Sequence, residues 1–138
     1  MKKFHPTILV FSGLALFYAC SMRLIYPAEA VFLQGYFAHP GNSLELHLDL
    51  VNEIRGVGAV MLLGGIATLL GAFRAAFRST AFVVAVVIFG GVILGRFFSF
   101  WVDGFPHGDL LRATVAEGVL AGLNLIGLGQ VLTKSGQR

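Results

Sequence analysis

The sequence TAFVVAVVIFGGVILGRFFSFWV, residues 80–102, contains a single charged residue, Arg96, in a run that is otherwise almost entirely apolar. An α-helix of this length rises about 35 Å and crosses the hydrocarbon core of a bilayer, which is about 30 Å thick. Backbone groups in lipid must be hydrogen-bonded within the segment, so the run predicts a transmembrane helix. A permanent positive charge inside such a helix requires a partner.

Three more runs of similar length and character are found at residues 7–26, 52–73 and 113–132. The chain is 57% hydrophobic and 12% charged, which is about half the charged fraction of an average soluble domain. We therefore predict an all-α integral membrane four-helix bundle that forms a single domain over residues 1–138. Its basic residues stand singly between apolar runs, which argues against nucleic acid as a partner and for the lipid bilayer.

The first run also has features of a secretory or lipoprotein signal, with a basic start, an apolar middle and Ala19 before Cys20. However, Phe17 and Tyr18 are bulky where a signal cleavage site requires small residues. We therefore expect the first run to be retained as a span. Cys20 is the only cysteine of the sequence, so no intrachain disulfide is expected.

The charged residues are divided between the two sides of the predicted bundle. With four spans, both termini and the second loop share one side, and that side has no acidic residue. Its basic residues are Lys2, Lys3, Arg74, Arg78, Lys134 and Arg138. The positive-inside rule places this side in the cytoplasm. We therefore predict a multi-pass protein of the bacterial inner membrane, with both termini cytoplasmic and the acidic side facing the periplasm.

The longest connection between spans is the outer loop, residues 27–51. Its Pro-Gly pair marks a turn, and Asn42 followed by Glu45 resembles a capping box. A helix is therefore expected to begin near Ser43 and to continue into the second span. Contacts with a ligand or a partner are expected on this outer side.

Three histidines lie in the outer loops among acidic residues. They are His39, His47 and His107. Their spacing matches no known ligand motif, so we predict no metal site. The sequence also lacks a P-loop, a dinucleotide fingerprint and a nucleophile elbow, so we predict no cofactor and no catalytic residue.

Two ionisable residues lie inside the outer edge of the membrane. Arg96 precedes the interfacial Trp101 by five residues and Glu117 follows Arg112 by five, which places each about 7 Å inside. An unpaired charge at the bilayer centre costs about 2.5–3.5 kcal/mol on insertion scales. We therefore expect Arg96 and Glu117 to form a pair, with Glu53 as a second acceptor at the outer rim.

Four further polar residues complete this predicted network: Asn52, Arg55, Asp103 and Asn124. Asn52 and Arg55 flank Glu53 at the start of the second span, and Asp103 follows the third. Asn124 lies seven residues beyond Glu117, about 10 Å deeper along the same helix.

Small residues recur at intervals of four in three of the predicted spans, and such faces let a neighbouring helix approach closely. They are Gly64, Thr68 and Ala72 in the second span, Gly91, Gly95 and Ser99 in the third, and Gly118 and Gly122 in the fourth.

Three interpretations of the charged residues stay open. The first is a structural ion network that fixes the register of the helices. The second is the polar end of a pocket for a lipid, a quinone or another amphipathic molecule. The third is a proton or ion path, which is the weakest because Asn124 is the only deep polar residue of its face.

The order of these motifs resembles the bacterial family called domain of unknown function 4345. The resemblance runs from about residue 53 to residue 128 and is weaker in the first span. It is carried by NEIRGVGAVMLLGG at the start of the second span, by FGGVILGRFFSFWVDGFP at the end of the third, and by an acid early in the fourth. It implies a small four-span membrane protein and assigns no activity.

Two patterns of that family match this chain closely. The first six positions of the pattern E-[LI]-R-[AG]-x-[YG]-G correspond to residues 53–58, and G-x-x-x-G-R-x-x-[SG] followed by an acid-Gly pair corresponds to residues 91–99 with Asp103 and Gly104. Val57 stands where the family often has an aromatic residue, and the outer loop is longer than usual. The loop is therefore where this member would differ in its partner.

Two functional hypotheses follow from these observations. The first is a non-enzymatic accessory or assembly subunit of a larger membrane complex, or a homo-oligomer, because the chain is small and has no soluble catalytic domain. The alternative is a small membrane enzyme or carrier that binds a hydrophobic molecule at Arg96 and Glu117. The alternative predicts a cavity between the spans that is open near these two residues, whereas a tightly filled bundle would exclude it.

Overall fold

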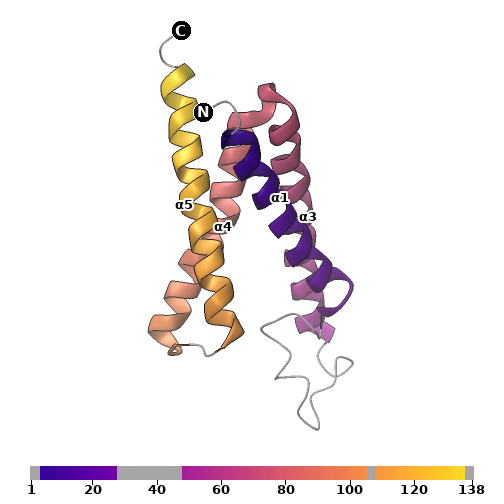
Figure 1. Ribbon diagram of the computed structural model, residues 1–138. Coiled ribbons are helices and arrows are strands. Elements are labelled where there is room, and N and C mark those ends of the chain that lie inside the picture. Colours follow the sequence, from indigo (N-terminus) through magenta and orange to yellow (C-terminus); the bar gives the residue numbers. More distant parts are fainter. Residues whose placement is uncertain (1–3, 28–47, 106–107, 136–138) are drawn as a thin grey trace.

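The computed structural model describes residues 4–27, 48–105 and 108–135 (Figure 1). Four long helices make up this part of the chain: α1 (Phe4–Leu24), α3 (Leu48–Phe73), α4 (Arg78–Val102) and α5 (Asp109–Ser135). A short 3-10 helix, η3 (Ala75–Phe77), joins α3 to α4, and no strand occurs among these residues. Each long helix is long and apolar enough to cross a membrane. The prediction of an all-α membrane protein with four spans is therefore confirmed.

The four helices begin earlier than the apolar runs from which they were predicted, and α1 ends at Leu24 rather than at residue 26. α3 begins at Leu48, four residues before the predicted limit, and α5 begins at Asp109 rather than at residue 113. The acidic residues Asp49 and Asp109 lie in the first turns of these two helices, where a negative charge interacts favourably with the helix dipole. The predicted helix start near Ser43 lies outside the described residues.

The four helices form two hairpins that meet at one end. α1 packs along α3, α4 packs along α5, and α3 also packs against α4, to which η3 connects it. Figure 1 shows that the two hairpins converge near the chain termini and diverge at the opposite end. Two hydrogen bonds join α1 to α5 across the converged part, between His5 Nε2 and Gln130 Oε1 (2.8 Å) and from Asn124 Nδ2 to Ser12 Oγ (2.7 Å).

The buried core follows this shape. One cluster near the termini contains Ile8, Leu9, Ala72, Ala81 and Phe82. A second cluster, nearer the middle of the helices, contains Leu16, Cys20, Met61, Ala85 and Phe89. Large apolar side chains also cover the outward faces of all four helices, which suits a lipid surrounding and not water.

Most of the small residues that were predicted to lie at close helix contacts do not lie at such contacts in the structure. In the second span, Gly64, Thr68 and Ala72 are buried, as expected. By contrast, no described atom lies within 4 Å of a Cβ built at Gly91 or Gly95, so no helix of the described chain packs closely on that stripe. The reason is that α4 turns another face inward, the one that carries its buried residues.

The close approaches occur instead between helices within and between the hairpins. A Cβ at Gly13 of α1 would lie 2.6 Å from Leu69 Cγ of α3, and a Cβ at Gly71 would collide with Ala81 of α4. In the fourth span, the described atom close to a Cβ at Gly118 is Ile93 Cδ1, at 3.7 Å, and no described atom lies within 4 Å of one at Gly122. Nearer the termini, a Cβ at Gly127 of α5 would collide with Phe82 of α4, so glycine also closes the contact between α4 and α5 there.

Candidate functional site

Arg96 and Glu117 are joined by two hydrogen bonds. Arg96 Nε donates to Glu117 Oε2 at 2.7 Å, and Arg96 Nη2 donates to Glu117 Oε1 at 3.0 Å. Because α4 and α5 are adjacent and antiparallel, a residue near the end of one helix meets a residue near the start of the other. This two-point contact is the geometry in which arginine binds a carboxylate most strongly.

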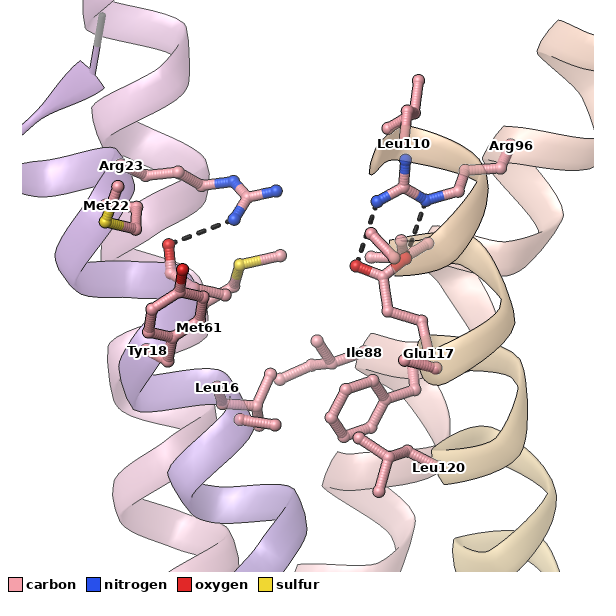
Figure 2. A pocket seen from close by; sticks show the side chains of 16 residues that line it. Leu16, Tyr18, Met22, Arg23, Met61, Ile88, Arg96, Leu110, Glu117 and Leu120 are labelled. Carbon is pink, nitrogen blue, oxygen red and sulfur yellow. Dashed lines mark hydrogen bonds and ion pairs between the residues drawn. The ribbon is translucent and has the colours of Figure 1, made fainter. Parts of the chain in front are cut away.

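The pair is shielded from its surroundings but not fully enclosed. The side chains of Arg96 and Glu117 are 15% and 18% exposed. Their remaining exposure faces a cavity of about 230 Å³ that lies between α1, α4 and α5, with Met61 of α3 in its wall (Figure 2). The helices therefore do not form the tightly filled bundle that would exclude a binding site at this position.

The cavity is apolar over most of its wall. Toward the core, its wall is formed by Leu16 of α1, Ile88 and Phe89 of α4, and Leu120 of α5. Two lining residues, Tyr18 of α1 and Ala116 of α5, are exposed, so the cavity opens between these two helices. Its charged lining residues are Arg23, Arg96 and Glu117.

A second cavity, of about 310 Å³, adjoins the first. Both are lined by Arg23, Met61, Val92, Arg96 and Leu110. The second cavity adds residues nearer the divergent end, among them Ser99 and Phe100 at the end of α4. Together the two cavities form one cleft between the hairpins, which we call the inter-hairpin cleft, and the two arginines lie midway along it.

Arg23 is a site residue that the sequence interpretation did not select. It lies in the last turn of α1, and its Nη1 donates to the carbonyl oxygen of Ala19 at 3.1 Å. Figure 2 shows its guanidinium group on the side of the cleft opposite to Arg96 and Glu117. Arg23, Arg96 and Glu117 thus contribute three charged groups to the wall of the same cavity.

The spacing of the first span contains a signal for Arg23. Leu16, Cys20 and Arg23 follow one another at intervals of four and three, which is the spacing of one helix face. Leu16 and Cys20 are buried against the rest of the bundle. The residue that continues this face at the outer end is therefore directed into the cleft as well.

The predicted acceptor Glu53 does not reach Arg96. It is exposed on α3, as are its neighbours Asn52 and Arg55, and none of the three lines the inter-hairpin cleft. Among the described residues, the ion pairs are Arg96 with Glu117 and Arg112 with Asp109. The reason is the divergence of the hairpins, which moves the start of α3 away from the end of α4.

The remaining predicted site residues lie elsewhere in the bundle. Asp103 is exposed and accepts a hydrogen bond from Ser99 Oγ at 2.9 Å, beyond the end of α4. Asn124 is fully buried, where its Nδ2 donates to Ser12 Oγ (2.7 Å) and to the carbonyl oxygen of Leu120 (2.8 Å). Asn124 thus joins two helices, and it is not part of the wall of the cleft. His39, His47 and His107 lie outside the described residues.

Comparison with known proteins gave one match. The model of the family described as domain of unknown function (DUF4345) matches residues 5–128. The match covers α1, α3 and α4 and most of α5, and therefore includes Arg23, Arg96 and Glu117. No curated protein and no solved structure matched the chain.

Proposed function

This chain belongs to the family of domain of unknown function 4345, and we propose that it is a multi-pass membrane protein that binds an amphipathic molecule between its two helix hairpins. The observation that supports this proposal is the inter-hairpin cleft, an apolar cavity of about 230 Å³ with the Arg96–Glu117 pair in its wall. A lipid or a quinone has the matching chemistry, with an apolar chain and a polar head.

The position of the ion pair favours binding over a purely structural role. A pair that only fixes helix register is best enclosed by packed side chains, because neighbouring apolar groups exclude water and strengthen the interaction. Here the pair borders an open cavity, and the core ends below it at Leu16, Phe89 and Leu120. The Arg96–Glu117 pair therefore faces a cavity large enough to hold part of a bound molecule.

The polar end of the cleft would decide which molecule binds. Lipid chains are as apolar as the wall of the cleft, so the apolar tail of a ligand gains little by moving from the bilayer into the protein. Hydrogen bonds and charge at the level of Arg96 then supply the selectivity. Both oxygens of Glu117 already accept hydrogen bonds from Arg96, which favours binding over proton transfer by this carboxylate.

This function can be tested by a substitution that fills the cleft with a larger side chain. Ala113 lines the cavity, whereas Val115, two residues further along α5, is exposed on the outer face. We expect wild-type protein purified in dodecyl maltoside to retain a lipophilic molecule, detected by mass spectrometry of an organic extract. Ala113→Phe should lose that molecule and the matched control Val115→Phe should keep it, with similar thermal midpoints for both variants. The same extract from all three proteins would refute the proposal.

The accessory-subunit hypothesis is a second proposal with its own support. Gly91 and Gly95 are exposed on α4, Gly95 in the wall of the second cavity, and no atom of the described chain lies within 4 Å of a Cβ built at either one. Such a face suits a transmembrane helix of another subunit or of a second copy. We also propose that the protein lies in the bacterial inner membrane with both termini in the cytoplasm.

A further inference from the structure

We propose that the molecule held in the inter-hairpin cleft is an uncharged amphiphile whose head group presents a carbonyl oxygen to the N–H groups of Arg96 that Glu117 does not engage. An ester and a quinone both have such a head group. Glu117 is the residue that selects this head group over an anion. This inference rests on the proposed binding function and adds to it the charge of the ligand and the residue that determines it.

Arg96 has hydrogen-bond donors that the ion pair does not use. A guanidinium group carries five N–H donors, and Glu117 accepts from Nε and from one N–H group of Nη2. Both N–H groups of Nη1 and the second one of Nη2 remain, and no described residue accepts a hydrogen bond from them. A polar group among apolar ones is costly without a partner, so these donors favour a head group with an acceptor oxygen.

The unused donors of Arg96 are open to the cleft. Two side-chain atoms of the described residues are sealed off without a partner, Arg78 Nε and Asn124 Oδ1, and Arg96 Nη1 is not one of them. Arg96 lines both cavities, and Figure 2 shows its third guanidinium nitrogen turned away from Glu117. An acceptor oxygen in the cleft beside Arg96 therefore reaches these N–H groups without breaking the ion pair.

The charge of Glu117 argues against an anion at this place. Glu117 already compensates the charge of Arg96, and an anionic head group would share one guanidinium group with the Glu117 carboxylate. Like charges at such short range repel each other, and apolar surroundings strengthen the repulsion. Arg23, on the other side of the cleft, is engaged by partners of its own, among them the carbonyl oxygen of Ala19. A head group that accepts hydrogen bonds without carrying a charge fits Arg96 best.

The place of Arg96 along the cleft sets the orientation of the ligand. Arg96 lines the inner and the outer cavity, so it stands between the apolar inner part and the divergent end. A carbonyl group at this level directs its chain inward along Leu16, Phe89 and Leu120. That is the orientation of a lipid in the leaflet on the side of the α4–α5 loop.

The first test adds matched probes to the full-length protein in dodecyl maltoside and follows the thermal midpoint against the mole fraction of probe. Methyl oleate has an ester carbonyl, oleate has the same chain with a carboxylate, and octadecene has no polar group. The buffer is alkaline, which keeps oleate ionised. We expect methyl oleate to raise the midpoint in a saturable manner, oleate to require a mole fraction about tenfold higher, and octadecene to have no effect. Decylubiquinone as a second carbonyl probe separates a quinone from an ester.

The variant Glu117→Gln then tests the selectivity. Glutamine still accepts a hydrogen bond from Arg96 but has no negative charge, so Arg96 becomes able to pair with an anion. We expect oleate to half-saturate this variant at a mole fraction about tenfold lower than the wild type, whereas the value for methyl oleate changes by less than about threefold. The matched control Asp109→Asn is also isosteric and lies on α5, but its side chain is 65% exposed, so it should keep the wild-type preference. A purely structural Glu117 would lower the ligand-free midpoint without altering the preference between probes.

The outcomes separate this inference from the proposed function. Tighter binding of oleate than of methyl oleate to the wild type would overturn the uncharged head group and leave binding in the cleft intact. Equal shifts with octadecene and methyl oleate would overturn the contact with Arg96, and an unchanged preference in Glu117→Gln would overturn the role of Glu117. If no probe shifts the midpoint and Ala113→Phe yields the same extract as the wild type, both proposals fail. The probe series on wild-type protein stands even if Glu117→Gln does not fold.

Discussion

The two ion pairs of the described chain differ strongly in their surroundings. Arg96 and Glu117 are 15% and 18% exposed, whereas Arg112 and Asp109 are 85% and 65% exposed. Water and mobile ions screen the exposed pair, and such pairs contribute about 0–1 kcal/mol to stability. The shielded pair is screened less, so the loss of one partner leaves a charge that nothing compensates.

We therefore predict a clear difference between two isosteric substitutions on α5. Glu117→Gln should lower the free energy of unfolding by about 1–3 kcal/mol, because it leaves Arg96 beside an apolar wall without its counter-charge. Asp109→Asn should change the same quantity by less than about 0.5 kcal/mol. The measurement is denaturation of α-helical structure by SDS in mixed micelles. Equal effects of the two substitutions would show that the Arg96–Glu117 pair contributes no more than a surface pair.

At the scale of single helices, one face of α4 decides both packing and chemistry. Phe82, Ala85 and Phe89 are buried, and Arg96 follows Phe89 by seven residues, so it continues the same face toward the outer end. The inward face of α4 is thus apolar for most of its length and charged where the core ends. Gly91 lies outside this face and is exposed, and Gly95 is exposed in the wall of the second cavity.

Two glycine substitutions test this arrangement. A Cβ at Gly71 would collide with Ala81 and would lie 3.1 Å from the carbonyl oxygen of Phe77, so Gly71→Ala should push α3 away from α4. We expect a loss of about 1–3 kcal/mol in the free energy of unfolding, which is typical of overpacking. Gly91→Ala, at an open position of α4, should be neutral or stabilising by up to about 1 kcal/mol, the usual difference in helix propensity.

The measurement for this pair is again unfolding in mixed micelles, with the monomer fraction checked by size-exclusion chromatography. A loss of stability in Gly91→Ala with a change of oligomeric state would instead show that another helix packs on this face. A neutral Gly71→Ala would show that α3 and α4 are not in close contact at this point.

At the scale of the whole molecule, the two termini lie at the same end and the two hairpins diverge toward the other (Figure 1). The second cavity of the inter-hairpin cleft lies toward the divergent end, where Ser99 and Phe100 line it. Arg74 and Arg78 lie at the terminal end, at the turn between α3 and α4. This distribution and the positive-inside rule predict that the end with the termini faces the cytoplasm.

Reporter fusions measure this orientation directly. Alkaline phosphatase fused after Gly104, in the α4–α5 loop, should be active, because that enzyme folds only outside the cytoplasm. The same reporter fused after Phe77 or at the C-terminus should be inactive, and green fluorescent protein at the C-terminus should be fluorescent. Active phosphatase at the C-terminus would reverse the orientation of the whole molecule.

Local features of the sequence account for the part of the structure that could be predicted. The four apolar runs specify four helices, and the proximity of Arg96 and Glu117 follows because they lie on consecutive antiparallel helices at the same depth. Whether Glu53 is a second acceptor for Arg96 was harder to predict. Glu53 has a similar depth, yet it lies on a hairpin that diverges, and the angle between hairpins depends on long-range contacts such as Gly71 with Ala81.

The cleft itself could not be predicted for the same reason. Its wall draws on all four helices, and no periodicity of a single helix shows whether the space between two hairpins is filled. Arg23 could have been predicted from the sequence, because it continues the helix face that holds the buried Leu16 and Cys20.

The opening of the cleft between α1 and α5, flanked by the exposed Tyr18 and Ala116, also determines how occupancy would be controlled. A molecule that arrives through this side diffuses in two dimensions within one leaflet and never has to leave the bilayer. Its mole fraction among the surrounding lipids, and not its aqueous concentration, then sets how often the site is filled. A change in membrane composition would therefore act on this protein directly.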